Sequence, residues 1–230
     1  MLKQKEKIKN KRKSQLIIFG SFLIIIGNIM IISKFLYNYF QIQTEKDLID
    51  KFYDEEKIKK KIVEEESTSN NEQNKNVTTD NEYIGILKIT KIGLEKGLVS
   101  KNSYYNNVNR NIFILNESDM PDKEKGNVIL AGHSGNGRIS FFKNLYKLEI
   151  NDYVSIFYNG SEYKYKVVNL YEIEKTGKAN IVRNVEKSTL TLITCKQNTN
   201  KQIVYICELI DVREEWNWKK KIILIKRWKQ

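Results

Sequence analysis

One cysteine at the end of a hydrophobic segment is the residue of this sequence best suited to chemistry. Residues 188–195 read Ser-Thr-Leu-Thr-Leu-Ile-Thr-Cys, so that leucines alternate with threonines before Cys195. This alternation predicts a β-strand with at least one buried face. A thiol at the exit of a rigid strand is held in place yet open to solvent, which suits a nucleophile. Cysteine is also among the most buried residue types, so simple packing at a strand end is the second interpretation.

The only histidine of the chain follows another apolar segment. Residues 127–131 read Asn-Val-Ile-Leu-Ala, and Gly132, His133, Ser134 and Gly135 come next. We expect the glycines on both sides to allow tight backbone geometry and to keep bulk away from the imidazole. Thiolate chemistry near neutral pH needs a base or a cationic partner, and histidine can supply either. A lone histidine is more often structural, but its pairing with Cys195 favours a catalytic role for both.

These two segments resemble those of the sortases, the cell-wall cysteine transpeptidases of Gram-positive bacteria. Residues 191–195, Thr-Leu-Ile-Thr-Cys, are similar to the TLxTC signature of that family, and Ala131-Gly132-His133 resembles its histidine strand end. The similarity covers roughly residues 82–212. Other segments resemble the first core strand, the short helical segment after the histidine and the strand after the cysteine: residues 85–89, 141–148 and 203–210.

The resemblance implies an all-β fold, a sortase-like closed β-barrel with short helices, preceded by an N-terminal transmembrane helix. It also implies a reaction. Cys195 would attack a backbone carbonyl in the C-terminal sorting signal of a secreted protein, and His133 would protonate the leaving amine. An amine of a peptidoglycan precursor or of a pilin then resolves the thioester, without a cofactor or a metal. Thr194 would shape the substrate groove, although it is also an ordinary β-branched strand residue.

One position departs from the family pattern. The family carries an arginine at the start of the strand after the cysteine, and Gln202 occupies that position here. A glutamine amide can donate a hydrogen bond to an oxyanion, but it brings no charge and no planar fork. We expect Gln202 to take the place of the arginine and Lys201 to assist in substrate binding. Arg138 and Arg183 are further basic candidates that the sequence does not locate in space.

The N-terminal part of the chain predicts a membrane anchor. Residues 1–15 form a basic segment, and residues 16–40 form an apolar segment with aromatic residues near its end. A membrane helix needs about 20 predominantly apolar residues. A cleaved signal peptide is the competing interpretation, but no small-residue cleavage site follows the apolar run. The positive-inside rule then predicts a single-pass protein of the cell membrane, with a cytoplasmic N-terminus and an extracellular catalytic domain.

The rest of the chain divides into three parts. Residues 41–80 predict a stalk, partly helical near the membrane and disordered further out. Residues 81–212 predict the catalytic β-barrel, because short apolar runs alternate with turn signals. The tail, residues 213–230, is basic and contains three tryptophans, so it predicts either a membrane-surface segment or an extra edge strand. The expected strands are residues 84–89, 111–115, 128–131, 153–158, 163–173, 189–194 and 203–210.

The charge of the chain argues against nucleic acid as a partner. The formal net charge is +12, but residues 1–13 hold seven basic side chains and one acid, and the tail holds seven and two. About +1 therefore remains for everything between them, which leaves no basic surface for phosphates. Both basic ends flank apolar segments, so they favour a membrane instead.

Two cysteines leave other functions open. Cys207 is expected to pack inside a strand, and a disulfide between Cys195 and Cys207 would block the nucleophile. One histidine and two separated cysteines form no metal-ligand cluster. A catalytically weak β-domain that binds cell-envelope peptides is one alternative, and a thiol redox or sensor protein is another. A papain-like hydrolase fits poorly, because papain-like enzymes place the cysteine before the histidine, whereas His133 precedes Cys195 here.

Overall fold

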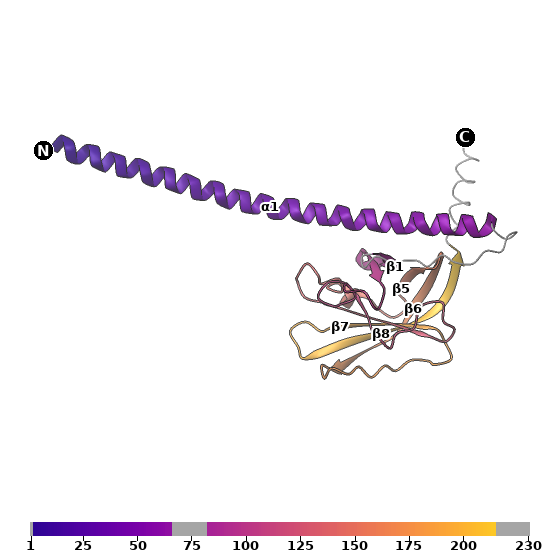
Figure 1. Cartoon of the computed structure of the whole chain (residues 1–230). Coiled ribbons are helices and arrows are strands. Elements are labelled where there is room, and N and C mark those ends of the chain that lie inside the picture. Colours follow the sequence, from indigo (N-terminus) through magenta and orange to yellow (C-terminus); the bar gives the residue numbers. More distant parts are fainter. Residues whose placement is uncertain (1, 66–81, 215–230) are drawn as a thin grey trace, which may run out of the picture. The chain divides into compact units, whose positions relative to one another are not determined.

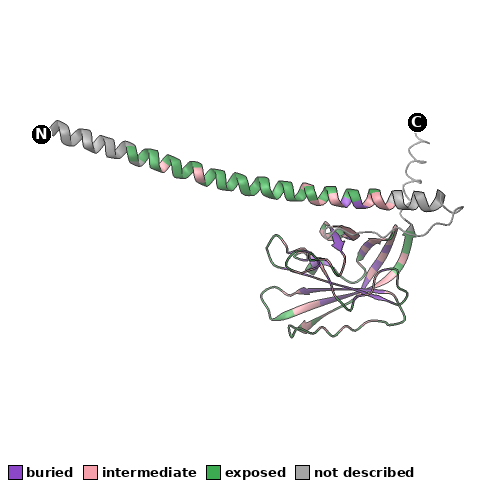
Figure 2. Cartoon of the chain, in the orientation of Figure 1, coloured by how far each residue is buried: buried purple, intermediate pink, exposed green. Residues whose placement is uncertain are grey.

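The computed structural model describes residues 2–65 and 82–214 and divides the chain into two compact units, Met1–Asp47 and Leu48–Gln230. The helix α1 (Leu2–Glu65) begins in the first unit and ends in the second. Its stretch Ile17–Glu56 contains a segment that is long and apolar enough to cross a membrane. Figure 2 shows that this stretch is mostly exposed. Ser21, Asn28 and Ser33 each hydrogen bond to a backbone carbonyl one turn earlier in the same helix.

The described residues 82–214 of the second unit form eight strands in one sheet. The sheet has the order β2-β1-β5-β6-β8-β7-β4-β3 and curls into a nearly closed barrel, with two short 3₁₀ helices between strands (Figure 1). The fold class predicted from the sequence is therefore confirmed. The elements are β1 (Tyr83–Ile89), η1 (Thr90–Ile92), β2 (Leu94–Val99), β3 (Phe113–Ile114), β4 (Asn127–Gly132), η2 (Leu145–Lys147), β5 (Tyr153–Tyr158), β6 (Ser161–Glu174), β7 (Thr189–Cys195) and β8 (Lys201–Glu214).

All seven expected strands are present, but β2 was not predicted. Its sequence, Leu-Glu-Lys-Gly-Leu-Val, places charges and a glycine where an alternating pattern needs apolar residues. The structure explains two of these residues. Lys96 is buried, with its ammonium group 4.9 Å from the ring centroid of Phe141. A side chain at Gly97 would lie within 2.3 Å of the Tyr83 ring, so only glycine leaves room for this aromatic residue.

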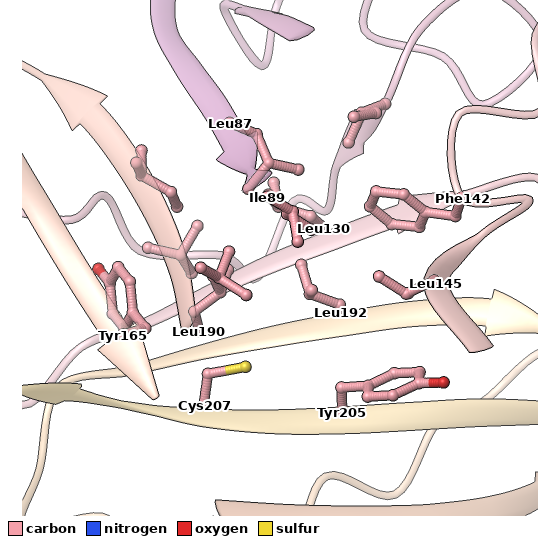
Figure 3. Packing of buried hydrophobic residues seen from close by; sticks show 14 of the residues in the cluster. Leu87, Ile89, Leu130, Phe142, Leu145, Tyr165, Leu190, Leu192, Tyr205 and Cys207 are labelled. Atoms are coloured by element: carbon pink, nitrogen blue, oxygen red, sulfur yellow. The ribbon is translucent and has the colours of Figure 1, made fainter. Parts of the chain in front are cut away.

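The barrel interior is filled by alternate residues of the strands. Leu190 and Leu192 of β7 point inward with Tyr205 and Cys207 of β8, next to Leu130 of β4 (Figure 3). The residues next to these in each strand face the other way. They form a second buried cluster, which consists of Ile129, Ile193, Val204 and Ile206. We call this side of β4, β7 and β8 the second face.

The final part of α1, within the residues expected to form the stalk, packs on the barrel. Ile49 and Phe52 are buried together with Ile86 of β1, and the ring of Tyr53 lies 5.4 Å from that of Phe157 on β5. The spacing of Ile49, Phe52 and Tyr53 places them on one helix face. Residues 66–80, the expected disordered part of the stalk, and residues 215–230 of the tail lie outside the described residues. The first two residues of the tail, 213 and 214, extend β8.

Candidate active site

The candidate site lies where two neighbouring strands end. β4 and β7 pair in parallel, with Gly132 opposite Thr194, whereas the other strand pairs of the described barrel are antiparallel. The next residues along the two strands are His133 and Cys195. Because successive strand side chains alternate between faces, both residues follow the parity of Ile129 and Ile193 and belong to the second face. The register therefore brings the single histidine and the half-buried cysteine together, although 62 positions separate them in sequence.

Two threonines of the 191–195 segment bind β7 to β4. The Thr194 hydroxyl donates to the Gly132 carbonyl at 2.8 Å, and the Thr191 hydroxyl donates to Asn127 Oδ1 at 2.9 Å. The side chain of Thr194 is only 4% exposed. Its hydroxyl is therefore used to fix the register one residue before the candidate pair, so we expect Thr194 to support the groove from inside.

The segments beyond the two strand ends are joined by reciprocal hydrogen bonds. Ser134, next to the histidine, donates from its buried hydroxyl to the Cys195 carbonyl at 2.5 Å. Gln197, two residues after the cysteine, donates from its amide to the Ser134 carbonyl at 2.6 Å. These two bonds continue the parallel pairing where the backbone ladder stops. They limit how far His133 and Cys195 can move apart.

The backbone around His133 is held by Phe142. The Phe142 amide donates to the His133 carbonyl at 3.0 Å, and the Phe142 ring is fully buried. A Cβ atom on Gly132 would lie 2.9 Å from this ring, so the glycine before the histidine is needed for close packing. Gly135 has no such requirement, because a Cβ there would meet only Ser140 Oγ at 3.6 Å.

Gln202 lies directly beside the candidate nucleophile. It is the strand partner of Cys195 in the antiparallel β7–β8 pair, so both side chains are on the second face. Gln202 is half-buried, and no group in the described residues hydrogen bonds to its amide. The amide is therefore free to donate to a group bound at Cys195.

The structure places two of the three basic candidates, Lys201 and Arg183, away from this pair. Lys201 precedes Gln202 and points to the opposite face, where its ammonium group lies 3.4 Å from Glu172. The same carboxylate contacts Lys196, and these lysines lower the pKa of Glu172, with the Lys196 hydrogen bond as the largest cause. Lys201 thus belongs to an ion cluster that fastens the β7–β8 loop to β6.

Arg183 does not replace the missing family residue by position. Arg183 donates to the carbonyl of Lys125 at 3.3 Å, at the beginning of β4. His133 follows the other end of that strand, on the order of 25 Å away at roughly 3.3 Å per residue. Arg138 is exposed in the loop after His133.

The second cysteine is far from the site and chemically protected. Cys207 is fully buried in β8, and burial raises the pKa of its thiol well above the usual range. Its partner on β7 is Leu190, five positions before Cys195, which corresponds to about 17 Å along a strand. A disulfide requires Cα atoms within about 7 Å. Both cysteines are free, and the two positions cannot be bridged without rebuilding the sheet.

An apolar wall extends from the candidate pair along the second face. The cluster of Ile129, Ile193, Val204 and Ile206 packs against Ala179 and Ile181 of the β6–β7 connection. The β6–β7 connection therefore covers this part of the second face.

Comparison with known proteins agrees with this geometry. A family model described as the sortase domain matches residues 87–210, more than half of the chain. The chain belongs to the sortase family. Sortase A of Bacillus anthracis is 29% identical over 126 residues, which cover 54% of this chain and 58% of that relative. The matched region thus spans well under two thirds of the curated relative, and no subclass of sortase is assigned.

Solved sortases share the fold. A sortase D5 transpeptidase of Clostridium perfringens superimposes with a TM-score of 0.54 at 21% identity, covering 73% of this chain and 98% of that chain. Sortase C-3 of Streptococcus pneumoniae gives a TM-score of 0.54 at 18% identity, covering 69% of this chain and 77% of that chain. At these identities the likeness concerns the fold, so the roles of individual residues rest on the site itself.

Three residues that meet at this candidate site were not predicted. Ser134 and Gln197 form the reciprocal bonds described above, and Asn109 Oδ1 lies 3.1 Å from His133 Nε2. Ser134 and Gln197 stand within two residues of His133 and Cys195, so proximity in sequence was an available signal. Asn109 is 24 residues before the histidine in an asparagine-rich loop, and no local pattern distinguishes it from its neighbours.

Proposed function

We propose that this sortase is a membrane-anchored cysteine transpeptidase in which Cys195 is the nucleophile and His133 its acid–base partner. The observation that carries the proposal is the parallel register of β4 and β7, which ends both strands side by side at these residues. The reciprocal bonds of Ser134 and Gln197 support it, because a nucleophile and its base must be held in reach of each other.

The proposed reaction transfers an acyl group in two steps. The Cys195 thiolate forms a C–S bond with the scissile carbonyl of a sorting signal, and the carbonyl electron pair moves to oxygen. When this intermediate collapses, the C–N bond breaks and protonated His133 gives its proton to the leaving amine. The amine of a cell-wall precursor or a pilin then attacks the thioester, loses a proton to His133 and releases the Cys195 thiolate.

Gln202 is proposed to stabilise the negative charge that develops on the carbonyl oxygen. Its side chain is on the same face as Cys195, in the neighbouring strand position, and its amide is not engaged by the described residues. An amide donor contributes less than an arginine, since it carries no charge. We therefore expect slower turnover than an arginine at this position would give.

The membrane anchor is proposed from α1. Large apolar side chains between residues 17 and 42 are more than 45% exposed. An apolar surface of this size is unfavourable in water and favourable in the hydrocarbon core of a bilayer. The polar side chains of Ser21, Asn28 and Ser33 in this stretch bond to carbonyls of their own helix, which suits a segment in contact with lipid. Protease added to intact protoplasts should remove the barrel and leave a short N-terminal fragment. Complete protection of the barrel would contradict an extracellular catalytic domain.

A mechanism-based trap tests the enzyme directly. The full chain in detergent micelles is incubated with a set of sorting-signal peptides whose scissile carbonyl is replaced by a thiol-reactive group. We expect mass mapping to find the adduct on Cys195, with none in Cys195→Ala and much slower labelling in His133→Ala. Cys207→Ser is the matched control and should react like the wild type, because Cys207 is buried in the barrel interior.

The same experiment separates the other two functions. Peptide binding without any adduct would indicate an envelope-peptide-binding domain rather than an enzyme. Labelling that requires both cysteines would indicate redox chemistry. The distance between Cys195 and Cys207 already disfavours this second outcome.

A further inference from the structure

A loop residue outside the strands contacts the histidine. Asn109 belongs to the connection between β2 and β3, and its side-chain oxygen lies 3.1 Å from His133 Nε2. An amide oxygen accepts hydrogen bonds only, so the imidazole donates from Nε2. A neutral imidazole carries one proton, so this bond leaves Nδ1 as the nitrogen with a free lone pair.

The loop that carries Asn109 is fixed by its own asparagines. Asn106 is buried and exchanges two hydrogen bonds with the Ile114 backbone, at 2.8 and 3.0 Å. Asn111 is buried as well, and its amide donates to the Gly97 carbonyl at 2.9 Å. These bonds anchor the loop on both sides of Asn109 to β2 and β3. The amide oxygen is thus held in place before any substrate binds.

The turn around Asn109 is also ordered locally. The backbone amide of Asn109 donates to Asn107 Oδ1 at 2.9 Å, and the backbone amide of Arg110 donates to the Asn107 carbonyl at 2.8 Å. The Arg110 guanidinium is directed away to Tyr104, whose hydroxyl lies 2.7 Å from Nη2. The loop therefore presents a neutral acceptor to the imidazole rather than a cation.

We propose that Asn109 is a positioning residue that fixes the tautomer and the orientation of His133. The bond reserves Nδ1 for the proton transfers, and Asn109 Oδ1 can accept this hydrogen bond from Nε2–H in both the neutral and the protonated imidazole. Asn109 touches neither the thiol nor the substrate in this role. The inference rests on the proposed function of His133, because an orienting bond matters only if the imidazole moves protons.

The single histidine makes this inference testable without activity. The full chain, labelled with ¹⁵N-histidine and held in detergent micelles, gives one imidazole whose nitrogen shifts report the tautomer. In the wild type at high pH we expect the proton on Nε2. In Asn109→Ala we expect a mixture of both tautomers, and in Asn109→Asp, which keeps an acceptor, the Nε2–H form again. Asn102→Ala, an exposed asparagine of the same loop, is the control and should leave the signals unchanged.

Kinetics provide the second readout. The loss of one hydrogen bond predicts about a tenfold lower kcat in Asn109→Ala, with KM unchanged and recovery in Asn109→Asp. Unaltered imidazole signals in Asn109→Ala would overturn the inference, whatever the stability of that variant. A different outcome would separate the two proposals. If Asn109→Ala alters the tautomer but the wild type forms no adduct with any trap peptide, the contact between Asn109 and His133 stands and the proposed function fails.

Discussion

The hydroxyl of Ser134 gives the sharpest test of how the site is held together. Ser134 is 7% exposed, and its hydroxyl donates to the Cys195 carbonyl at 2.5 Å, so it fixes the backbone of the proposed nucleophile to the residue after His133. Ser134→Ala removes the bond and leaves the size of the side chain almost unchanged. We predict that this substitution reduces the rate of thioester formation far more than it reduces stability.

The two magnitudes follow from different physical effects. A single intramolecular hydrogen bond contributes about 1 kcal/mol to folding, which is only a fivefold change in an equilibrium constant. Reacting groups are more sensitive, since a displacement of about 1 Å can reduce a rate by about 10²-fold. Gln197 still donates to the Ser134 carbonyl at 2.6 Å in the variant, so part of the alignment remains. We therefore expect a rate loss of about 10- to 100-fold for a stability loss of about 1 kcal/mol.

The assay compares Ser134→Ala with a serine that bonds elsewhere. Ser155 on β5 donates to Glu162 at 2.7 Å, so Ser155→Ala removes a bond of similar length on another part of the barrel. Rates come from single-turnover labelling of Cys195 by a trap peptide, and stability comes from hydrogen exchange of the β4 and β7 amides. The control should retain the wild-type rate.

A cycle with Gln197→Ala then measures the coupling between the two bonds. Both bonds join the same two segments, so the double variant should lose less rate than the product of the single losses. A wild-type rate in Ser134→Ala, with its stability reduced, would show that the bond does not position the thiol. Equal rate losses in Ser134→Ala and Ser155→Ala would refute the reasoning as well.

Three further predictions concern the strands around the site. Gly132→Ala should cost about 1–3 kcal/mol, because its Cβ would press against the buried Phe142 ring, whereas Gly135→Ala should leave the thermal midpoint unchanged. Asp119 accepts bonds from Lys123 and from the Asn127 amide, which lower its pKa, Lys123 first. These bonds stabilise the folded state at pH values above 3.8, the ordinary pKa of this carboxyl group. Their contribution is lost as the pH falls through the lower pKa of the folded state. Asp119→Asn should therefore reduce the urea midpoint at pH 7 and approach the wild type in strong acid. Gln202→Ala and Gln202→Leu should lower kcat by about 10²-fold, while Gln202→Arg retains or increases it; wild-type turnover in the first two would make this residue a strand-edge residue only.

Local sequence patterns predicted most of the barrel, because its strands alternate between two environments. Residues such as Leu190 and Leu192 face the interior, while Thr191 and Ile193 belong to the second face, and this period of two is visible in the sequence. The strand β2 escaped prediction because Lys96 is buried beside an aromatic ring and Gly97 makes room for another. Such residues satisfy tertiary contacts and not a local pattern.

The site was predicted only in part for a similar reason. His133 and Cys195 could be proposed as candidates because their residue types are rare in this chain and each follows an apolar strand. The parallel register that unites them, and the contact with Asn109, depend on which strands become neighbours, and no local pattern encodes this. For the same reason the sequence could not show that Lys201 and Arg183 are engaged elsewhere.

The parallel pairing of β4 with β7 also determines when the site can exist. Contacts between residues about 60 positions apart form late, because closing a long loop costs entropy before the contact stabilises anything. In the sequence, β5 and β6 lie between β4 and β7, and β8 must pair with β7 to bring Gln202 beside Cys195. A partly folded chain in which these strands have not paired thus has a thiol and an imidazole that are not held together. The barrel that gives the enzyme its stability therefore also delays its chemistry until folding is complete.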